Sequence, residues 1–207
     1  MTRQEKINIV RNNIIENAQI YSSELAGRYY LYIFQNQCFE MYYDTDNYLH
    51  LTGVDTRLSS SQFYALAKGR TLQSNQIYFN QRHPLATAMK KSDNLKDLSK
   101  FIKEGYFVIK DLVTDTYVYP YAITNIDQSL LVGLKEEDVN ELYIPQSFRV
   151  KGNIFNKTKN ENIFEIQYIL CKTDIQAKYN IILYAENSDF NNLDSTIKTK
   201  INDTLLR

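Results

Sequence analysis

Apolar residues recur at steps of three and four positions near the start of the chain. This spacing places them on one side of a helix. Gly27 follows the last of them and is typical of a helix end. The pattern therefore predicts a helix over residues 3–27, with these positions facing the core: Ile7, Val10, Ile14, Ala18, Tyr21 and Leu25.

Segments dense in aromatic and β-branched residues, or alternating in polarity, predict strands along much of the rest of the chain. Short turn-like segments such as 156–160 separate the later strands, which favours antiparallel pairing. The segment 48–51 is expected to be short and extended, with His50 where it meets a loop. The main strands are expected at 29–34, 38–43, 106–110, 116–119, 130–134, 162–172 and 179–184.

Three further helices are expected. One is capped by a serine at 59–61 and closed by Gly69; another runs from 92 or 93 to 104; a terminal helix covers about 192–206. In the second of these, Leu95, Leu98, Phe101 and Ile102 should face inward, and Lys96, Lys100 and Lys103 should face solvent. Helices first and strands later predict one α+β domain over 1–207, in which N-terminal helices pack on an antiparallel sheet.

Composition is that of an ordinary globular protein of 207 residues, with 43% hydrophobic and 23% charged residues. The N-terminal residues lack the apolar stretch of a secretory signal, and no run is long enough to span a bilayer, so a cytoplasmic protein without membrane contact is expected. Cys38 and Cys171 are isolated and no histidine stands at metal-ligand spacing. Neither a metal nor another cofactor is expected, and the thiols should be reduced.

The charges balance overall, with 24 basic and 24 acidic residues, which argues against the globally basic character of many nucleic-acid-binding proteins. They are nevertheless segregated. Residues 68–110 hold nine basic and three acidic residues, whereas 111–147 hold one basic and seven acidic. This asymmetry fits either a one-sided anionic partner or a solvated lysine face. The 17 tyrosines fit either base stacking or half-buried strands and codon bias.

Four short segments together resemble a known family. They are 21–27 (YSSELAG), 50–54 (HLTGV), the pair Phe63 and Tyr64, and 143–147 (YIPQS). The chain is similar, from about Ala18 to Tyr184, to phage and mobile-element proteins named for barnase, EndoU, colicin-type and RelE-like nucleases. The resemblance implies a barnase/RelE-like α+β fold and nuclease activity. It implies catalytic roles for His50, Thr52 and Arg57, because these three lie in or beside the matching His-Leu-Thr-Gly segment.

The chemistry of these residues suits RNA cleavage without a metal. Such a reaction needs a base for the ribose 2′-hydroxyl, an acid for the departing 5′-oxygen, and donors or cations for the phosphorane. His50 can exchange protons near neutral pH. Thr52 could donate a hydrogen bond, and Arg57 could bind phosphate oxygens. The alternative is a partly buried histidine bonded to backbone, with the following residues simply forming a turn.

Three more residues are candidates for substrate binding: Lys110, Ser147 and Arg149. Alternation along a strand would put Ser147 and Arg149 on one face; the alternative is a strand edge opened by Pro145. His83 precedes Pro84 and is either a second proton-transfer group or a loop residue at a helix start. A serine-hydrolase elbow and a P-loop motif are both absent from the sequence.

Two functions remain open from sequence. The first is a metal-independent ribonuclease, a hydrolase of phage or mobile-element origin that binds RNA and acts as a toxin or in host takeover. The second is a non-catalytic, anti-defence protein of the same fold that inhibits a host defence or RNA-processing protein. It could present residues 136–138 as a nucleic-acid mimic, or the lysine-rich region as a docking face.

Overall fold

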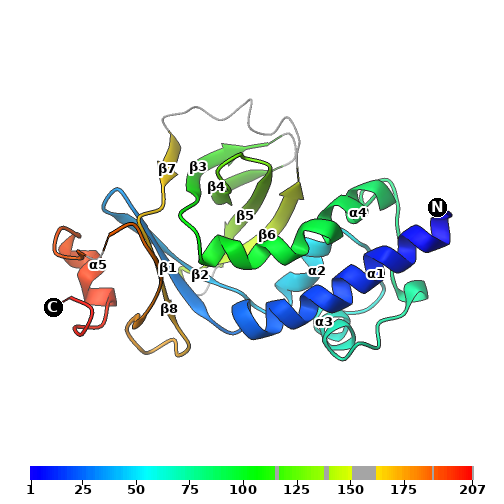
Figure 1. The fold of residues 1–207 in the computed structure, drawn as a ribbon, viewed down its shortest axis with the longest axis horizontal. Helices are drawn as coiled ribbons and strands as arrows, with labels where there is room; N and C mark the ends of the chain where they lie inside the picture. Colours follow the sequence, from blue (N-terminus) through cyan, green and yellow to red (C-terminus); the bar gives the residue numbers. More distant parts are fainter. Residues whose placement is uncertain (115–116, 138–139, 151–161, 188, 207) are drawn as a thin grey trace.

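The computed structural model describes residues 1–114, 117–137, 140–150, 162–187 and 189–206 (Figure 1). The helical elements are α1 (Arg3–Ile20), the π-helical turn η1 (Tyr21–Leu25), α2 (Asn47–Thr52), α3 (Ser60–Lys68), η2 (Ser74–Gln76), α4 (Leu85–Asn94), η3 (Leu95–Ile102) and α5 (Ser195–Lys200). The strands are β1 (Tyr29–Phe34), β2 (Gln37–Tyr42), β3 (Phe107–Val113), β4 (Val118–Thr124), β5 (Leu130–Glu136), β6 (Tyr143–Val150), β7 (Ile163–Glu165), β8 (Tyr168–Lys172) and β9 (Ile181–Ala185).

All the described strands join one curled sheet in the order β7-β3-β4-β5-β6-β2-β1-β8-β9. The α+β class is confirmed, but the expectation of a purely antiparallel sheet is wrong. β2 and β6 pair in parallel, with Met41 opposite Tyr143. Parallel neighbours need a long crossover, and the chain supplies one that contains α2 to α4 and β3 to β5. This crossover brings β6 back beside the strand that leads into α2.

Helix α1 forms where the apolar stripe predicts it. Thr2 caps its first turn, and the Thr2 hydroxyl accepts a hydrogen bond from the Glu5 backbone N–H at 3.2 Å. The stripe is buried at Val10, Ile14 and Ala18. In Figure 1, α1 runs along one side of the molecule, beside α3, α4 and η3, and ends close to β1. This helical layer covers one face of the sheet and leaves the N- and C-termini at opposite ends.

The C-terminal segment packs on the other face of the β1–β8 part of the sheet, where Leu31, Ile33 and Ile197 share a small core. Helix α5 has six residues and is shorter than the expected 192–206. The reason is that Ile201 turns extended and pairs in a β-bridge with Tyr179. Glu40 on β2 strengthens this attachment, since it accepts hydrogen bonds from the Tyr179 hydroxyl at 2.7 Å and from Lys200.

Two local expectations were wrong. The helix expected from 92 begins at Leu85, directly after Pro84, and changes to 3-10 geometry at Leu95. Its inward and outward residues are nevertheless as predicted. The segment around His50 is helical rather than extended, because Tyr48 and Leu51 are both buried one helical turn apart. The predicted turn at 156–160, as well as Thr116 and Asp138, lies outside the described residues.

Candidate active-site groove

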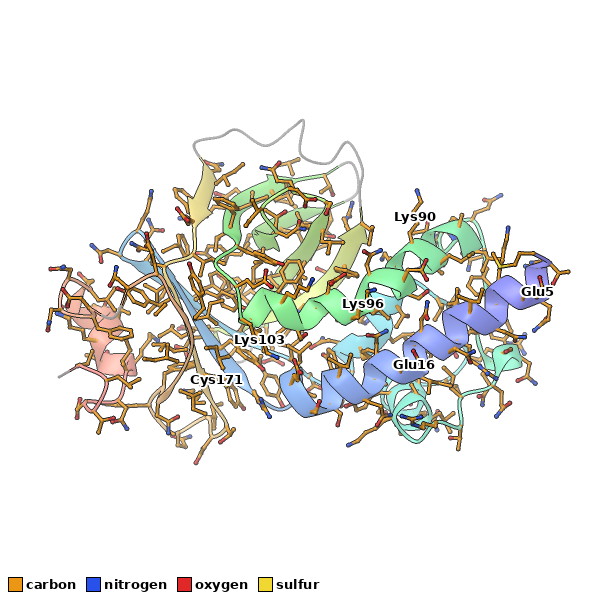
Figure 2. The ribbon with its side chains drawn as sticks, viewed as in Figure 1. Glu5, Glu16, Lys90, Lys96, Lys103 and Cys171 are labelled. Atoms are coloured by element: carbon orange, nitrogen blue, oxygen red, sulfur yellow. The ribbon has the colours of Figure 1, made fainter. Side chains whose placement is uncertain are left out.

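A groove of about 400 Å³ lies between β6 and the start of α4. Strand β6 pairs with β2 only at Tyr143 among the described residues, so α2 and α4 pack beside the rest of that edge instead. The groove is lined by Arg82, Thr87, Lys90, Lys91, Ser147, Arg149 and Val150. Figure 2 shows Lys90 projecting from α4 on the side away from α1. Four cationic side chains and two hydroxyls in one groove suit a ligand that carries phosphate.

His50 lies on α2, which packs against β6. Its ring remains exposed to solvent. The pKa of His50 is lowered below its ordinary value of 6.5, first because part of the ring is withdrawn from water, and then because Lys135 and His83 add positive charge nearby. Lys91 acts in the same direction and Asp46 opposes it. A neutral imidazole that reaches solvent beside several cations can accept a proton at neutral pH.

Thr52 and Gly53 form the turn that ends α2. The Thr52 side chain is fully buried, and its hydroxyl donates to the Leu49 carbonyl at 2.8 Å while accepting a hydrogen bond from the Val54 N–H at 3.4 Å. Gly53 has φ +74°, a left-handed conformation that favours glycine. Thr52 therefore fastens the end of the His50 helix, and its hydroxyl points at backbone groups.

Gly53 also makes room for Lys91. A Cβ atom at residue 53 would lie 2.6 Å from the Lys91 Cδ and 3.4 Å from its Cε. The aliphatic stem of Lys91 thus crosses the turn of the His-Leu-Thr-Gly segment, and Lys91 also lines the groove. Burial, and then the positive charge of Arg149, lower the pKa of Lys91 from 10.5 to about 8. Partial burial makes the charged form of Lys91 unfavourable, so an anion that binds beside it offsets this free-energy cost.

The second histidine of the chain, His83, lies in the loop before α4, next to the groove residue Arg82. His83 is close enough for its charge to act on the pKa of His50. Asn80 shapes this loop: its side-chain oxygen accepts hydrogen bonds from the Arg82 N–H at 2.8 Å and the His83 N–H at 2.9 Å. The Asn80 amide donates to Asp55 Oδ2 at 2.8 Å. Asn80 therefore ties the loop that carries Arg82 and His83 to the chain just after Gly53.

Ser147 and Arg149 both line the groove from β6. They pair with Gly133 and Leu131 of β5, two positions apart, and so occupy one face of the sheet. Arg149 Nη2 donates a hydrogen bond to the Tyr119 hydroxyl at 3.1 Å, and its guanidinium carbon lies 5.5 Å from the centre of the Tyr119 ring. The guanidinium is thereby held at the rim of the groove.

Two residues considered for the site lie outside the groove. Arg57 is exposed, with its guanidinium carbon 5.5 Å from the centre of the Tyr78 ring. Lys110 on β3 donates to the Gln37 side chain at 3.0 Å. Gln37 begins β2 and α2 follows the other end of that strand, so Lys110 lies at the far end of β2 from His50.

Sequence reasoning missed the individual contributions of Arg82, Thr87, Lys90 and Lys91. The basic run over 68–110 was the available signal, and the structure divides that run. Lys90 and Lys91 line the groove, whereas Lys100 and Lys103 pair with Asp97 at 2.9 Å and Glu24 at 2.7 Å on the helical layer. The run therefore has two parts: lysines that line the groove, and lysines that form ion pairs on the helical layer.

Among the described residues, no group of three or more His, Cys, Asp or Glu side chains could hold a metal ion. No helix in the same part of the chain has the length and apolar character needed to cross a membrane.

Residues 13–188 match the model of the family described as phage-Barnase-EndoU-ColicinE5/D-RelE like nuclease4. The chain belongs to this family. The match spans α2 and every residue that lines the groove, and it confirms the resemblance seen in the four short segments. The family description points to nucleic acid as the class of substrate. The chain matches no curated protein and no solved structure.

Proposed function

We propose that the protein is a metal-independent endoribonuclease that cleaves RNA in the groove between β6 and the start of α4, beside which α2 packs. The observation that carries the proposal is the gathering of Arg82, Lys90, Lys91 and Arg149 in one open groove, with His50 on an adjoining helix close enough to His83 and Lys91 for their charges to lower its pKa. The word phage in the family description supports an origin in a phage or mobile element. A toxin or host-takeover role follows as part of the proposal, because uncontrolled RNA cleavage harms a host.

In this proposal His50 is the general base. Its lowered pKa keeps it unprotonated at neutral pH, and its exposure allows it to reach a ribose 2′-hydroxyl. It takes the proton as the 2′-oxygen attacks phosphorus. His83 gives a proton to the 5′-oxygen as the phosphorus–oxygen bond to it breaks. The products are a 2′,3′-cyclic phosphate and a 5′-hydroxyl, and no oxidant or reductant is needed.

Lys91 and Arg149 stabilise the negative charge that grows on the phosphorane, with Ser147 as a neutral hydrogen-bond donor. Arg149 supplies a planar pair of donors that can meet two phosphate oxygens. Lys91 is a point charge whose partial burial strengthens its attraction to an anion. Thr52, which the resemblance makes a catalytic candidate, holds His50 in place through the end of α2.

The test compares variants on a labelled single-stranded RNA in EDTA. His50→Gln and His83→Gln should each slow cleavage by roughly 10²- to 10⁴-fold, the usual loss when a general acid or base is removed. Lys96→Gln is the matched control, because Lys96 is an exposed cation outside the groove. Arg57→Gln distinguishes two assignments of the catalytic residues. Retained activity favours the residues of the groove, which exclude Arg57, and lost activity favours the catalytic role that the family resemblance implies for Arg57.

The pH dependence gives a second readout. Because the pKa of His50 is lowered, the acidic limb of the kcat/KM profile should fall at a pH below 6.5, the ordinary value for histidine. His50→Gln should remove that limb. A folded wild-type protein that leaves RNA intact in EDTA would contradict the proposal and favour the non-catalytic alternative.

A further inference from the structure

The groove continues into an aromatic surface that the reaction described above does not use. Arg149 is the link, because it lines the groove and also contacts Tyr119 through its guanidinium. The Tyr119 ring lies across Gly133: a Cβ atom at residue 133 would come within 2.6 Å of that ring. Tyr119 is only 2% exposed. The Tyr119 ring thus packs directly on the backbone of β5, which fixes its position beside Arg149.

Tyr117 extends this surface outward. Its ring centre lies 4.8 Å from that of Tyr119, with the planes tilted by 46°. Tyr117 is 40% exposed, although large aromatic side chains usually bury their rings. The hairpin holds it in place, since the Thr114 N–H donates to the Tyr117 carbonyl at 2.8 Å and the Tyr117 N–H donates to the Thr114 hydroxyl at 3.0 Å.

We propose that Tyr117, supported by Tyr119, is a stacking subsite for the nucleobase next to the phosphate that Arg149 binds. The inference rests on the proposed function, and it adds single-stranded RNA with an unpaired flanking base as the substrate class. The Arg149 guanidinium contacts the buried Tyr119 ring, and the exposed Tyr117 ring packs against Tyr119, so a phosphate and its neighbouring base in single-stranded nucleic acid can be bound one ring apart. Every base has a π-face, so this subsite accepts any of the four bases.

The positive charge of the neighbouring groove favours single-stranded RNA over a protein as the ligand. The rings adjoin a groove that holds Arg82, Lys90, Lys91 and Arg149, and a polyanion with flat apolar groups meets both features at once. A folded protein could match both features only if its surface placed acidic groups and flat apolar groups side by side, as the phosphates and bases of RNA do.

The experiment uses three variants of the full chain. Tyr117→Ala removes the ring, and Tyr117→Phe keeps the stacking surface without the hydroxyl. Val118→Ala is the matched control, because Val118 is 57% exposed in the next position and points to the other face of the strand. Steady-state cleavage of a short single-stranded RNA is compared with cleavage of the same RNA carrying one abasic nucleotide beside the scissile phosphate.

Tyr117→Ala should raise KM by roughly 10- to 100-fold, as expected from the loss of one base–aromatic stack, and leave kcat nearly unchanged. Tyr117→Phe and Val118→Ala should behave like the wild type. On the abasic RNA, the wild type should fall to the level of Tyr117→Ala. Equal KM values for the wild type and Tyr117→Ala on intact RNA would overturn the stacking subsite while leaving the ribonuclease proposal intact.

A binding measurement keeps the two proposals separate. The RNA carries 2-aminopurine at the flanking position, and its fluorescence is followed as protein is added. Quenching by the wild type but not by Tyr117→Ala supports the subsite even if no cleavage occurs. A Tyr117→Ala variant that quenches as well as the wild type does, or a wild type that causes no quenching, overturns it. Binding of a protein in place of RNA, lost in Tyr117→Ala, would also count against it.

Discussion

Replacing Lys91 by methionine should make the protein more stable and nearly inactive. Methionine keeps an unbranched stem over Gly53 but removes the partly buried charge. The difference between the ordinary pKa of 10.5 and about 8 corresponds to about 3 kcal/mol of preference for the neutral amine in the folded state. At neutral pH that amount opposes folding of the wild type, and Lys91→Met removes it.

The sign of the pH dependence follows from the same values. Between pH 8 and 10.5 the unfolded chain holds a proton on Lys91 that the folded protein has released, so the stability of the wild type rises with pH in this window. The advantage of Lys91→Met should therefore be largest near neutral pH. It should shrink by about 2 kcal/mol by about pH 9.5. The tyrosines titrate in both proteins alike, so their contribution cancels in the difference.

Urea unfolding of both proteins at about pH 7 and about pH 9.5 measures this, with buffers free of phosphate because an anion in the groove would stabilise the wild type. The RNA cleavage rate of the variant should fall by roughly 10²- to 10³-fold, as expected when one preorganised cation is lost. A variant that is less stable than the wild type at both pH values, or that gains no stability at the lower one, would refute the account of Lys91.

Three further outcomes are expected. Gly53→Ala should lose about 1 kcal/mol of stability to its left-handed backbone and should slow cleavage, because the new methyl group displaces the stem of Lys91; thermal unfolding and kcat measure the two effects. Asn80→Ala should lower kcat about tenfold at temperatures where both proteins are folded, since the loop of His83 loses its internal acceptor; an unchanged kcat would contradict this. Glu40→Ala should cost about 2 kcal/mol in urea unfolding, because the buried Lys172 ammonium and the Tyr179 hydroxyl lose the carboxylate that they contact, and the cleavage rate of the folded fraction should stay the same.

The parts of the fold that depend on local pattern could be predicted from the sequence. The stripe of α1, the burial of Leu98 and Phe101 and the outward lysines of η3 follow from spacing alone. Helix α2 could not be recognised in the same way, because its six residues are too few to establish a period. The parallel contact between Met41 and Tyr143 joins residues about a hundred positions apart, and nothing in the local sequence encodes it.

The groove could be predicted only in part, because it too depends on contacts between distant parts of the chain. His50, Ser147 and Arg149 stood out by residue type, and the basic run indicated that cations were available. The groove is assembled by tertiary packing from the loop before α4, α4 itself and β6, with α2 packed beside them. The passage of Lys91 over Gly53 depends on that packing, so no spacing in the chain reveals it.

The most direct test of the central claim is cleavage, in EDTA, of an RNA that carries a single 2′-deoxy nucleotide at a mapped cleavage position. We predict that the wild type cuts the unmodified RNA to leave a 2′,3′-cyclic phosphate, and that in the modified RNA it spares only the deoxy position. Continued cutting at the deoxy position would contradict attack by the ribose hydroxyl, and with it the assignment of His50 as the base that activates this group.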